Sequence, residues 1–284
     1  MPMNDRQMRQ HVIGLVREVI QRHGLPPCPT WRQVFKALDL PMPKRVSLRD
    51  QDGARDGRQV FVSSRLTCPE RVVFTIFHEI VHILIDEDGE LPSELHDHFY
   101  HSEDEQAETR VLESLCHAGA AQFIMPQEDF LPLMRDGNWR VSELQKVIER
   151  FKCSTVAAGF QYALNHPKEC ILVICEHGLP PAAAARAEMR GRAIAPVLFG
   201  AYVVCSPDVQ YPMHCYATVP KTHLIHQAWE SGTEAVGRDH GFYNTFRTWP
   251  IPCEVTCLRG RAYAAFFPKG NVPTQHHPYQ QSLF

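Results

Sequence analysis

One helical segment constrains this sequence more than any other feature, because it is apolar on almost every side. It begins at Pro69, a residue suited to the first position of a helix, and continues as RVVFTIFHEIVHILI. A helix that is apolar all round belongs inside a domain, so we expect this one at the centre of the N-terminal part of the chain. Two histidines and a glutamate interrupt the apolar run. Burying three ionisable groups costs several kcal/mol unless something compensates, and a metal ion would.

These three residues are His78, Glu79 and His82, in the order His-Glu-x-x-His. Residues four apart lie on the same face of a helix, so both imidazoles can direct a nitrogen at one divalent cation. Glu79 lies to one side, where it can accept a proton from water. This arrangement is typical of zinc peptidases. We therefore predict His78 and His82 as metal ligands and Glu79 as the catalytic base. The alternative is a pair of ordinary core histidines beside an exposed glutamate.

A catalytic zinc site needs a third protein ligand and an open position for water. The next predicted helix, residues 105–124, offers Glu105, Glu108 and Glu113. Glu113 lies among apolar residues, where a carboxylate needs a partner, whereas the other two lie in a charged stretch typical of a solvated face. We therefore favour Glu113. Several histidines have the same ligand chemistry and compete with it: His96, His98, His101 and His117.

Two runs of residues resemble helices of the ImmA/IrrE metallopeptidases. RLTCPERVVFTIFHEIVHILIDED is similar to the family pattern R-x-x-x-x-x-R-F-T-x-x-H-E-x-x-H, and LESLCHAGAAQFIMP is similar to E-x-x-C-N-x-x-A-A-x-x-L-M-P. The resemblance implies Glu113 as the third ligand. One departure is His117, which stands where the family usually has asparagine, and it either supports a ligand or approaches the metal itself. Zinc is the simplest cofactor, and the same ligands also accept manganese or iron.

The expected secondary structure changes twice along the chain of 284 residues, and this length is typical of two or three domains. Residues 1–126 alternate helical patterns with short strands, residues 127–166 are helical, and residues 167–284 are rich in β-type runs, Pro and Gly. We predict an α+β protein. The resemblance implies a zincin-like metallopeptidase domain in the first stretch, a helix-turn-helix domain in the second and a GAF-like mixed α+β domain in the third.

Within the first stretch we expect a helix that ends at Gly24, a short helix over 31–40, a strand over 59–63 and a polar loop over 86–104. Strand 59–63 either presents a free edge to an extended substrate or is a plain core strand. In the third stretch we expect one helix and several strands. The strands lie near 170–175, 197–205, 214–219, 254–258 and 262–267, and the helix lies near 222–230.

The composition limits which classes of binding partner and which cellular compartment we expect for this protein. A net charge of -3 gives no general attraction to nucleic acid or to acidic membranes. No apolar run approaches the ~20 residues needed to span a bilayer, and the N-terminus has no secretion signal. The ten cysteines are scattered without a CxxC pair, so we expect reduced thiols. These features together predict a cytoplasmic protein.

We therefore predict a metal-dependent, site-specific endopeptidase. The resemblance implies that its substrate is an XRE-type helix-turn-helix transcriptional repressor, whose cleavage derepresses stress or DNA-damage response genes. The alternative is a non-proteolytic regulator that binds DNA or a repressor and carries a vestigial metal site. Direct nucleic-acid binding is not expected, because the second helix of the predicted pair, STVAAGFQYALN, has no Lys or Arg.

Two roles stay open at this point. Transition-state stabilisation has three candidates, which are Tyr100, Arg110 and a loop histidine. GAF-like domains often sense small molecules, so a group of C-terminal residues either lines a ligand pocket or serves in ordinary packing. These residues are His214, Cys215, His223, Trp229, Tyr243 and Arg247.

Overall fold

The computed structural model describes residues 3–49, 51–100, 106–191, 193–207, 209, 215–240 and 250–269. The chain divides into two compact units. The first comprises Met1–Pro132 and Glu149–Ser154, and the second comprises Leu133–Ile148 and Thr155–Phe284. The predicted division into domains 1–126, 127–166 and 167–284 stays a prediction.

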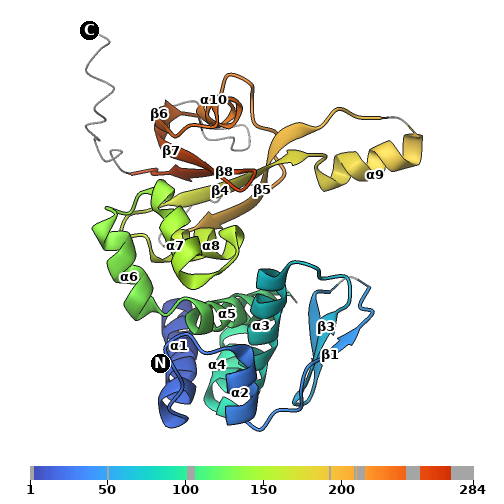
Figure 1. The fold of residues 1–284 in the computed structure, drawn as a ribbon, viewed down its shortest axis with the longest axis vertical. Helices are drawn as coiled ribbons and strands as arrows, with labels where there is room; N and C mark the ends of the chain where they lie inside the picture. Colours follow the sequence, from blue (N-terminus) through green and yellow to red (C-terminus); the bar gives the residue numbers. More distant parts are fainter. Residues whose placement is uncertain are drawn as a thin grey trace. The chain divides into compact units, whose positions relative to one another are not determined.

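Helix α3 is the centre of the first unit, as its all-round apolar sequence predicts (Figure 1). Four other helices pack against it. The five are α1 (Asp5–Arg22), α2 (Trp31–Ala37), α3 (Pro69–Asp88), α4 (Glu90–Phe99) and α5 (Ala107–Ile124). On α3, Ile80 and Val81 are fully buried, and the ring of Phe77 stacks on Phe123 of α5 with the ring centroids 4.8 Å apart. Helices α3 and α5 therefore lie against each other along the core of this unit.

A three-stranded sheet packs on α3 in the order β1-β3-β2. Its strands are β1 (Lys44–Val46), β2 (Gly53–Asp56) and β3 (Gln59–Ser63). Strand β3 pairs with β1 in parallel and with β2 in antiparallel fashion, so both of its edges are occupied. The suggestion that strand 59–63 presents a free edge is therefore wrong, and the alternative of a core strand is right. Its alternate residues Val60 and Val62 are buried, while β2 lies at an edge of the sheet.

Helix α4 lies within the segment that the sequence predicted as a loop, residues 86–104. The segment is mostly polar, which is typical of a loop, but it contains two leucines four positions apart. These residues, Leu91 and Leu95, are buried in the core of the first unit. Gly89 has a φ of 76°, which lets the chain turn between α3 and α4. The carboxylate of Asp88 accepts a hydrogen bond of 2.9 Å from the backbone N–H of Leu91 and so caps the new helix.

The second unit is built on a five-stranded antiparallel sheet in the order β5-β4-β8-β7-β6. The strands are β4 (Ile171–Gly178), β5 (Val197–Cys205), β6 (Ala235–Asp239), β7 (Ile251–Leu258) and β8 (Arg261–Phe266). Four of them match predicted runs, and β6 was not predicted. The predicted strand over 214–219 is reduced, among the described residues, to one isolated bridge between Phe199 and Thr218.

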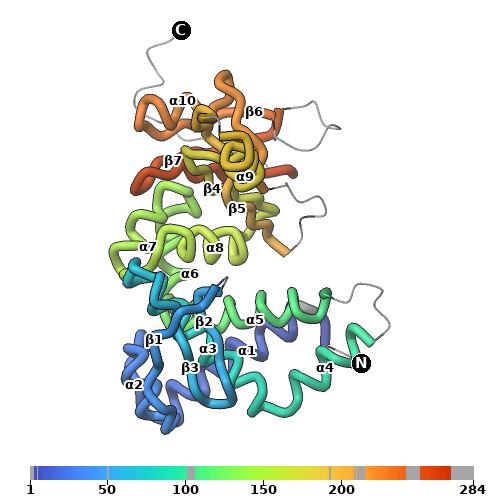
Figure 2. The backbone as a smooth tube through the Cα atoms, turned by 90° about the vertical axis from the view of Figure 1, so that its right-hand side faces the viewer, coloured from blue at the N-terminus to red at the C-terminus, as the bar shows by residue number. Residues whose placement is uncertain are grey.

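Helices α8 and α10 cover opposite faces of this sheet (Figure 2). Side chains at alternate positions of β4, such as Ile171 and Val173, form one core with α10 (Leu224–Ser231). The positions between them face α8 (Thr155–Asn165), where Gly159 lies against Leu172. The two faces of β4 therefore contribute to two different cores, which explains why its sequence is apolar at successive positions.

The remaining elements are α6 (Gln127–Asp136), η1 (Val141–Glu143), α7 (Leu144–Phe151) and α9 (Pro181–Arg190). Helices α7 and α8 occupy the segment predicted as a helix-turn-helix pair, which stays a prediction. Among the described helices, none combines the length and the apolar composition needed to cross a membrane.

Gly119 provides a test of the packing in the first unit. A Cβ atom at this position of α5 would lie 2.7 Å from both γ-methyls of Val81 and 2.9 Å from a γ-methyl of Val12. We expect Gly119→Ala to lower the free energy of unfolding by about 1–3 kcal/mol, because three helices meet at this point. Urea unfolding followed by circular dichroism measures the change.

Gly14 of α1 is the matched control, because it is exposed and a Cβ there would meet nothing within 4 Å. Gly14→Ala should raise the free energy of unfolding by about 0.5–1 kcal/mol through helix propensity. Equal effects of the two substitutions would contradict the close approach of the helices at Gly119.

Candidate metal centre

Three predicted ligand side chains converge in the first unit. His78 and His82 lie one turn apart on α3, and Glu113 comes from α5, which packs along α3. The Nε2 atoms of the two histidines are 3.2 Å apart. The carboxylate oxygens of Glu113 lie 3.1 Å from Nε2 of His78 and 3.4 Å from Nε2 of His82. His78, His82 and Glu113 together make a group that could hold a metal ion.

The spacing of these atoms fits a tetrahedral divalent cation. Ligand atoms placed about 2.0–2.1 Å from a zinc ion lie roughly 3.3–3.4 Å from one another, close to the separations found between the three residues. Two imidazole nitrogens that face each other this closely repel through their lone pairs unless a proton or a cation lies between them. Two imidazoles and a carboxylate are also the donor set of catalytic zinc sites.

The electrostatics of Glu113 suit a ligand. Hydrogen bonds from His78 and His82 hold the pKa of its carboxyl well below the ordinary value, so the group stays ionised. Its side chain is 47% exposed, whereas the two histidines are buried. The two imidazoles are therefore anchored on the buried side of α3, and the carboxylate of Glu113 comes from α5 at the solvent side.

Glu79 lies beside this group but faces the sheet. It is buried, and burial raises the pKa of its carboxyl, while the nearby His78 and His82 act in the opposite direction. A Cβ atom on Gly53 of β2 would lie 2.5 Å from Oε1 of Glu79. The bare backbone of this edge strand therefore makes room for the carboxylate. A carboxyl with a raised pKa is suited to exchange protons with water near neutral pH.

Sequence reasoning missed two residues near Glu79. One is Gly53, and the available signal was a glycine within a strand, which often marks a close approach by another group. The other is Arg55, two positions further along β2, whose guanidinium lies 2.5 Å from the carboxylate of Asp86 and lowers the pKa of Glu79. No pattern in the sequence pairs Arg55 with α3.

None of the other described candidate ligands on α4 and at the start of α5 joins the group of His78, His82 and Glu113. Glu108 is exposed and outside the group, while Glu105 and His101 lie outside the described residues. The rings of His96 and His98 contact neighbours on their own helix or just beyond it, Tyr100 and Phe99.

His117 lies close to the centre without joining the group of three ligands. Its ring centroid is 4.8 Å from that of His78 and 5.6 Å from that of Phe74. This contact is consistent with a role in supporting the ligand His78, and that role stays a prediction. The proposed stabilisers Tyr100 and Arg110 are both exposed, and nothing in the geometry chooses between them.

The structure places the six residues of the predicted C-terminal pocket in different surroundings. His214, Tyr243 and Arg247 lie outside the described residues, and Cys215 is exposed.

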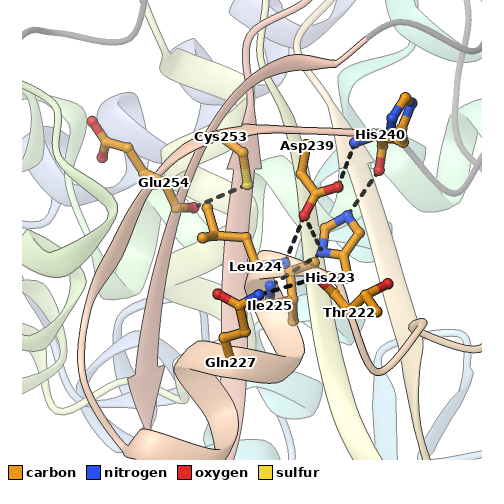
Figure 3. A network of polar contacts seen from close by, with 9 residues as sticks. All are labelled: Thr222, His223, Leu224, Ile225, Gln227, Asp239, His240, Cys253 and Glu254. Atoms are coloured by element: carbon orange, nitrogen blue, oxygen red, sulfur yellow. Dashed lines mark hydrogen bonds and ion pairs between the residues drawn. The ribbon is translucent and has the colours of Figure 1, made fainter.

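The other two are described in full. His223 is buried and its ring is occupied in backbone hydrogen bonds, so it serves in structure rather than as a lining residue (Figure 3). Trp229 does line a cavity of the second unit.

Comparison with known proteins agrees with this geometry. Residues 35–162 match the Peptidase_M78 family, described as the IrrE N-terminal-like domain. Over this segment the chain is similar to the ImmA/IrrE family. The predicted resemblance is therefore confirmed, and with it a mixed α+β protein that contains a zincin-like peptidase domain.

Two relatives in this family are the radiation response metalloproteases IrrE of two Deinococcus species. The chain is 29% identical to the Deinococcus radiodurans protein over 193 residues, which cover 67% of this chain and 58% of that protein. It is 31% identical to the Deinococcus deserti protein over 132 residues, which cover 46% and 45% of the two chains. The alignments therefore span about half the length of these relatives.

A solved structure of a Mycobacterium tuberculosis transcriptional regulator is similar in fold. The TM-score is 0.57 and the sequence identity is 11%, over 91% of this chain and 76% of that one. At this identity the similarity concerns the fold alone.

Removal of single ligands tests the metal centre. We expect the chain to bind one equivalent of zinc or manganese and to be stabilised by about 2.7 kcal/mol when the free cation is at a hundred times its Kd. His78→Ala, His82→Ala and Glu113→Gln should each abolish this stabilisation. Metal analysis and thermal unfolding with and without the cation measure it. His96→Ala is the control and should bind the cation as the unaltered chain does.

Acidification should release the cation. Imidazole must be neutral to bind a metal, whereas Glu113, with its lowered pKa, stays ionised to low pH. Loss of metal as the pH falls therefore does not require protonation of the Glu113 carboxylate. Retention of the cation by Glu113→Gln would rule out the assignment of the third ligand.

Proposed function

We propose that this chain is a metal-dependent endopeptidase in which His78, His82 and Glu113 hold a divalent cation and Glu79 is the general base. The observation that carries the proposal is the convergence of two imidazoles and a carboxylate at separations of 3.1 to 3.4 Å. The family match supports the general class, because an IrrE N-terminal-like peptidase domain implies a metal cofactor and a protein substrate. We propose zinc as the metal, with manganese as the second choice.

The chemistry follows from the side chains around the site. A cation held here would polarise the scissile carbonyl and lower the pKa of a water molecule to about 7. Glu79 accepts the proton of that water and later donates it to the leaving amine. Its burial between α3 and β2 excludes bulk water from the carboxylate, and Gly53 leaves the space in which the carboxylate sits.

The outer edge of β2, which pairs with no other described strand, suits an extended polypeptide. An extended segment can add to an edge strand through main-chain hydrogen bonds, and β2 is the edge that lies against Glu79. This placement favours an endopeptidase that takes an unfolded or extended stretch of a protein. The proposed substrate-binding edge is therefore β2 and not β3.

The identity of the substrate is the finer part of the proposal. We propose a single cut in an XRE-type helix-turn-helix repressor, which would derepress stress or DNA-damage response genes in the cytoplasm. The support is the resemblance to ImmA/IrrE proteins, together with the relatives named as radiation response metalloproteases. The rival function, a non-proteolytic regulator that binds DNA or a repressor, is less favoured because α8, the second helix of the predicted pair, carries no Lys or Arg.

Glu79→Gln separates the two functions. We expect the variant to bind the cation as the unaltered chain does and to lose cleavage by at least about a hundredfold, because an amide cannot accept the proton. The assay incubates the purified chain and zinc or manganese with candidate XRE-type repressors and follows fragments by mass spectrometry. Glu108→Gln, an exposed residue on α5, is the control and should cleave normally. Cleavage that survives in Glu79→Gln would refute the role of this residue.

Gly53→Ala tests the placement of the base. The added methyl group would press on the Glu79 carboxylate, so we expect cleavage to fall by about 10- to 100-fold while the cation stays bound. Ala54→Ser changes the neighbouring residue of β2, whose side chain points to the opposite face, and should have little effect. If Gly53→Ala cleaved as fast as Ala54→Ser, the edge strand would have no part in positioning Glu79.

A further inference from the structure

A cavity of about 350 Å³ lies in the second unit, apart from the residues of the metal centre. It is formed by the end of β4, the start of β5, the segment around Thr218 and one side of α10. Cavities that bind small molecules have volumes of about 300–1,000 Å³, so this one can admit a molecule of one or two rings.

The interior of the cavity is apolar and has one flat wall. Leu198 and Val219 are buried members of the core beneath α10 and form its floor. Trp229 of α10 and His177 of β4 line one side, with ring centroids 6.2 Å apart and planes inclined by 21°. The indole of Trp229 is a flat aromatic ring on which a planar aromatic ring can pack with an offset.

The cavity is lined by one lysine and one glutamate. Lys221 lines it, is exposed, and makes no ion pair within the described part of the chain. The one acidic lining residue, Glu230, already lies 3.2 Å from Nδ1 of His226, another lining residue. Among the described residues no carboxylate pairs with the ammonium group of Lys221, and an anion on the ligand would supply that counter-charge.

The helix that carries this wall is fixed in place before any ligand arrives (Figure 3). Nδ1 of His223 accepts a hydrogen bond of 3.1 Å from the backbone N–H of Ile225, and Nε2 donates one of 2.8 Å to the carbonyl of His240. The carboxylate of Asp239 accepts 2.6 Å and 2.7 Å bonds from the N–H groups of Leu224 and His240. The start of α10 is thus tied to the end of β6, and a preformed wall reduces the ordering needed for binding.

We propose that this cavity binds a small planar aromatic anion, with its ring against Trp229 and its carboxylate, sulfonate or phosphate group at Lys221. The flat wall selects for the ring, the apolar floor selects against strongly hydrated molecules, and the lysine selects for the negative charge. The site is separate from the peptidase residues and stands whether or not the chain cleaves a repressor.

The test compares two ligands of the same shape on the full chain, 2-naphthoate and 2-naphthamide, by isothermal titration calorimetry. We expect 2-naphthoate to bind with one-to-one stoichiometry and about tenfold more tightly than the neutral amide, as the loss of one hydrogen bond to a charged group would give. Lys221→Met keeps the apolar stem and should remove this preference. Lys36→Met, an exposed lysine of α2 in the first unit, should leave it intact.

Two further variants test the ring site. Trp229→Leu should weaken both ligands by about tenfold or more, because the flat wall is lost. Thr218→Phe changes an exposed lining residue and should fill the cavity and block both ligands without disturbing the core. Circular dichroism establishes that each variant is folded. The proposal is overturned if 2-naphthoate does not bind, if it binds no better than the amide, or if Thr218→Phe binds both ligands normally.

Discussion

The first unit depends on how it compensates three ionisable groups buried on its most apolar helix. His78 and His82 face each other on α3, and apart from Thr75 and Glu79 the other buried residues of that helix are apolar. Compensation comes from two directions: the carboxylate of Glu113 from α5, and the space left by Gly53 for Glu79 on β2. The polar groups that would destabilise a plain core helix thereby become a site with the donors of a metal centre.

The framework around this site is tight enough to hold it. Gly119 lets α1, α3 and α5 approach one another closely, which fixes the register of Glu113 against the histidines. Asp88, at the end of α3, accepts a hydrogen bond from the N–H of Leu91 and lies 3.0 Å from a ring nitrogen of His11, so it joins α1, α3 and α4. Precise placement of this kind is what catalysis by positioned groups requires.

The second unit applies a different principle. Side chains are buried on both faces of its single five-stranded sheet. One face forms a core with α8 and the other face forms a core with α10. The cavity proposed as an anion site lies at the edge of the core beneath α10. The start of α10 is held by hydrogen bonds to His223 and Asp239. The chain thus carries two chemically distinct candidate sites, one in each unit.

The sequence by itself determined α3, the four strands with apolar β-type runs and the candidate ligands His78 and His82, since helical spacing and β-type composition are local properties. It also favoured Glu113, because a carboxylate among apolar residues needs a partner. Only the tertiary structure decided the rest. Strand order placed β3 in the interior and β2 at the edge, and packing made a helix of α4 from two leucines in a polar segment. Close approach of Gly53 to Glu79 joins residues far apart in the chain, and local patterns carry no information about such contacts.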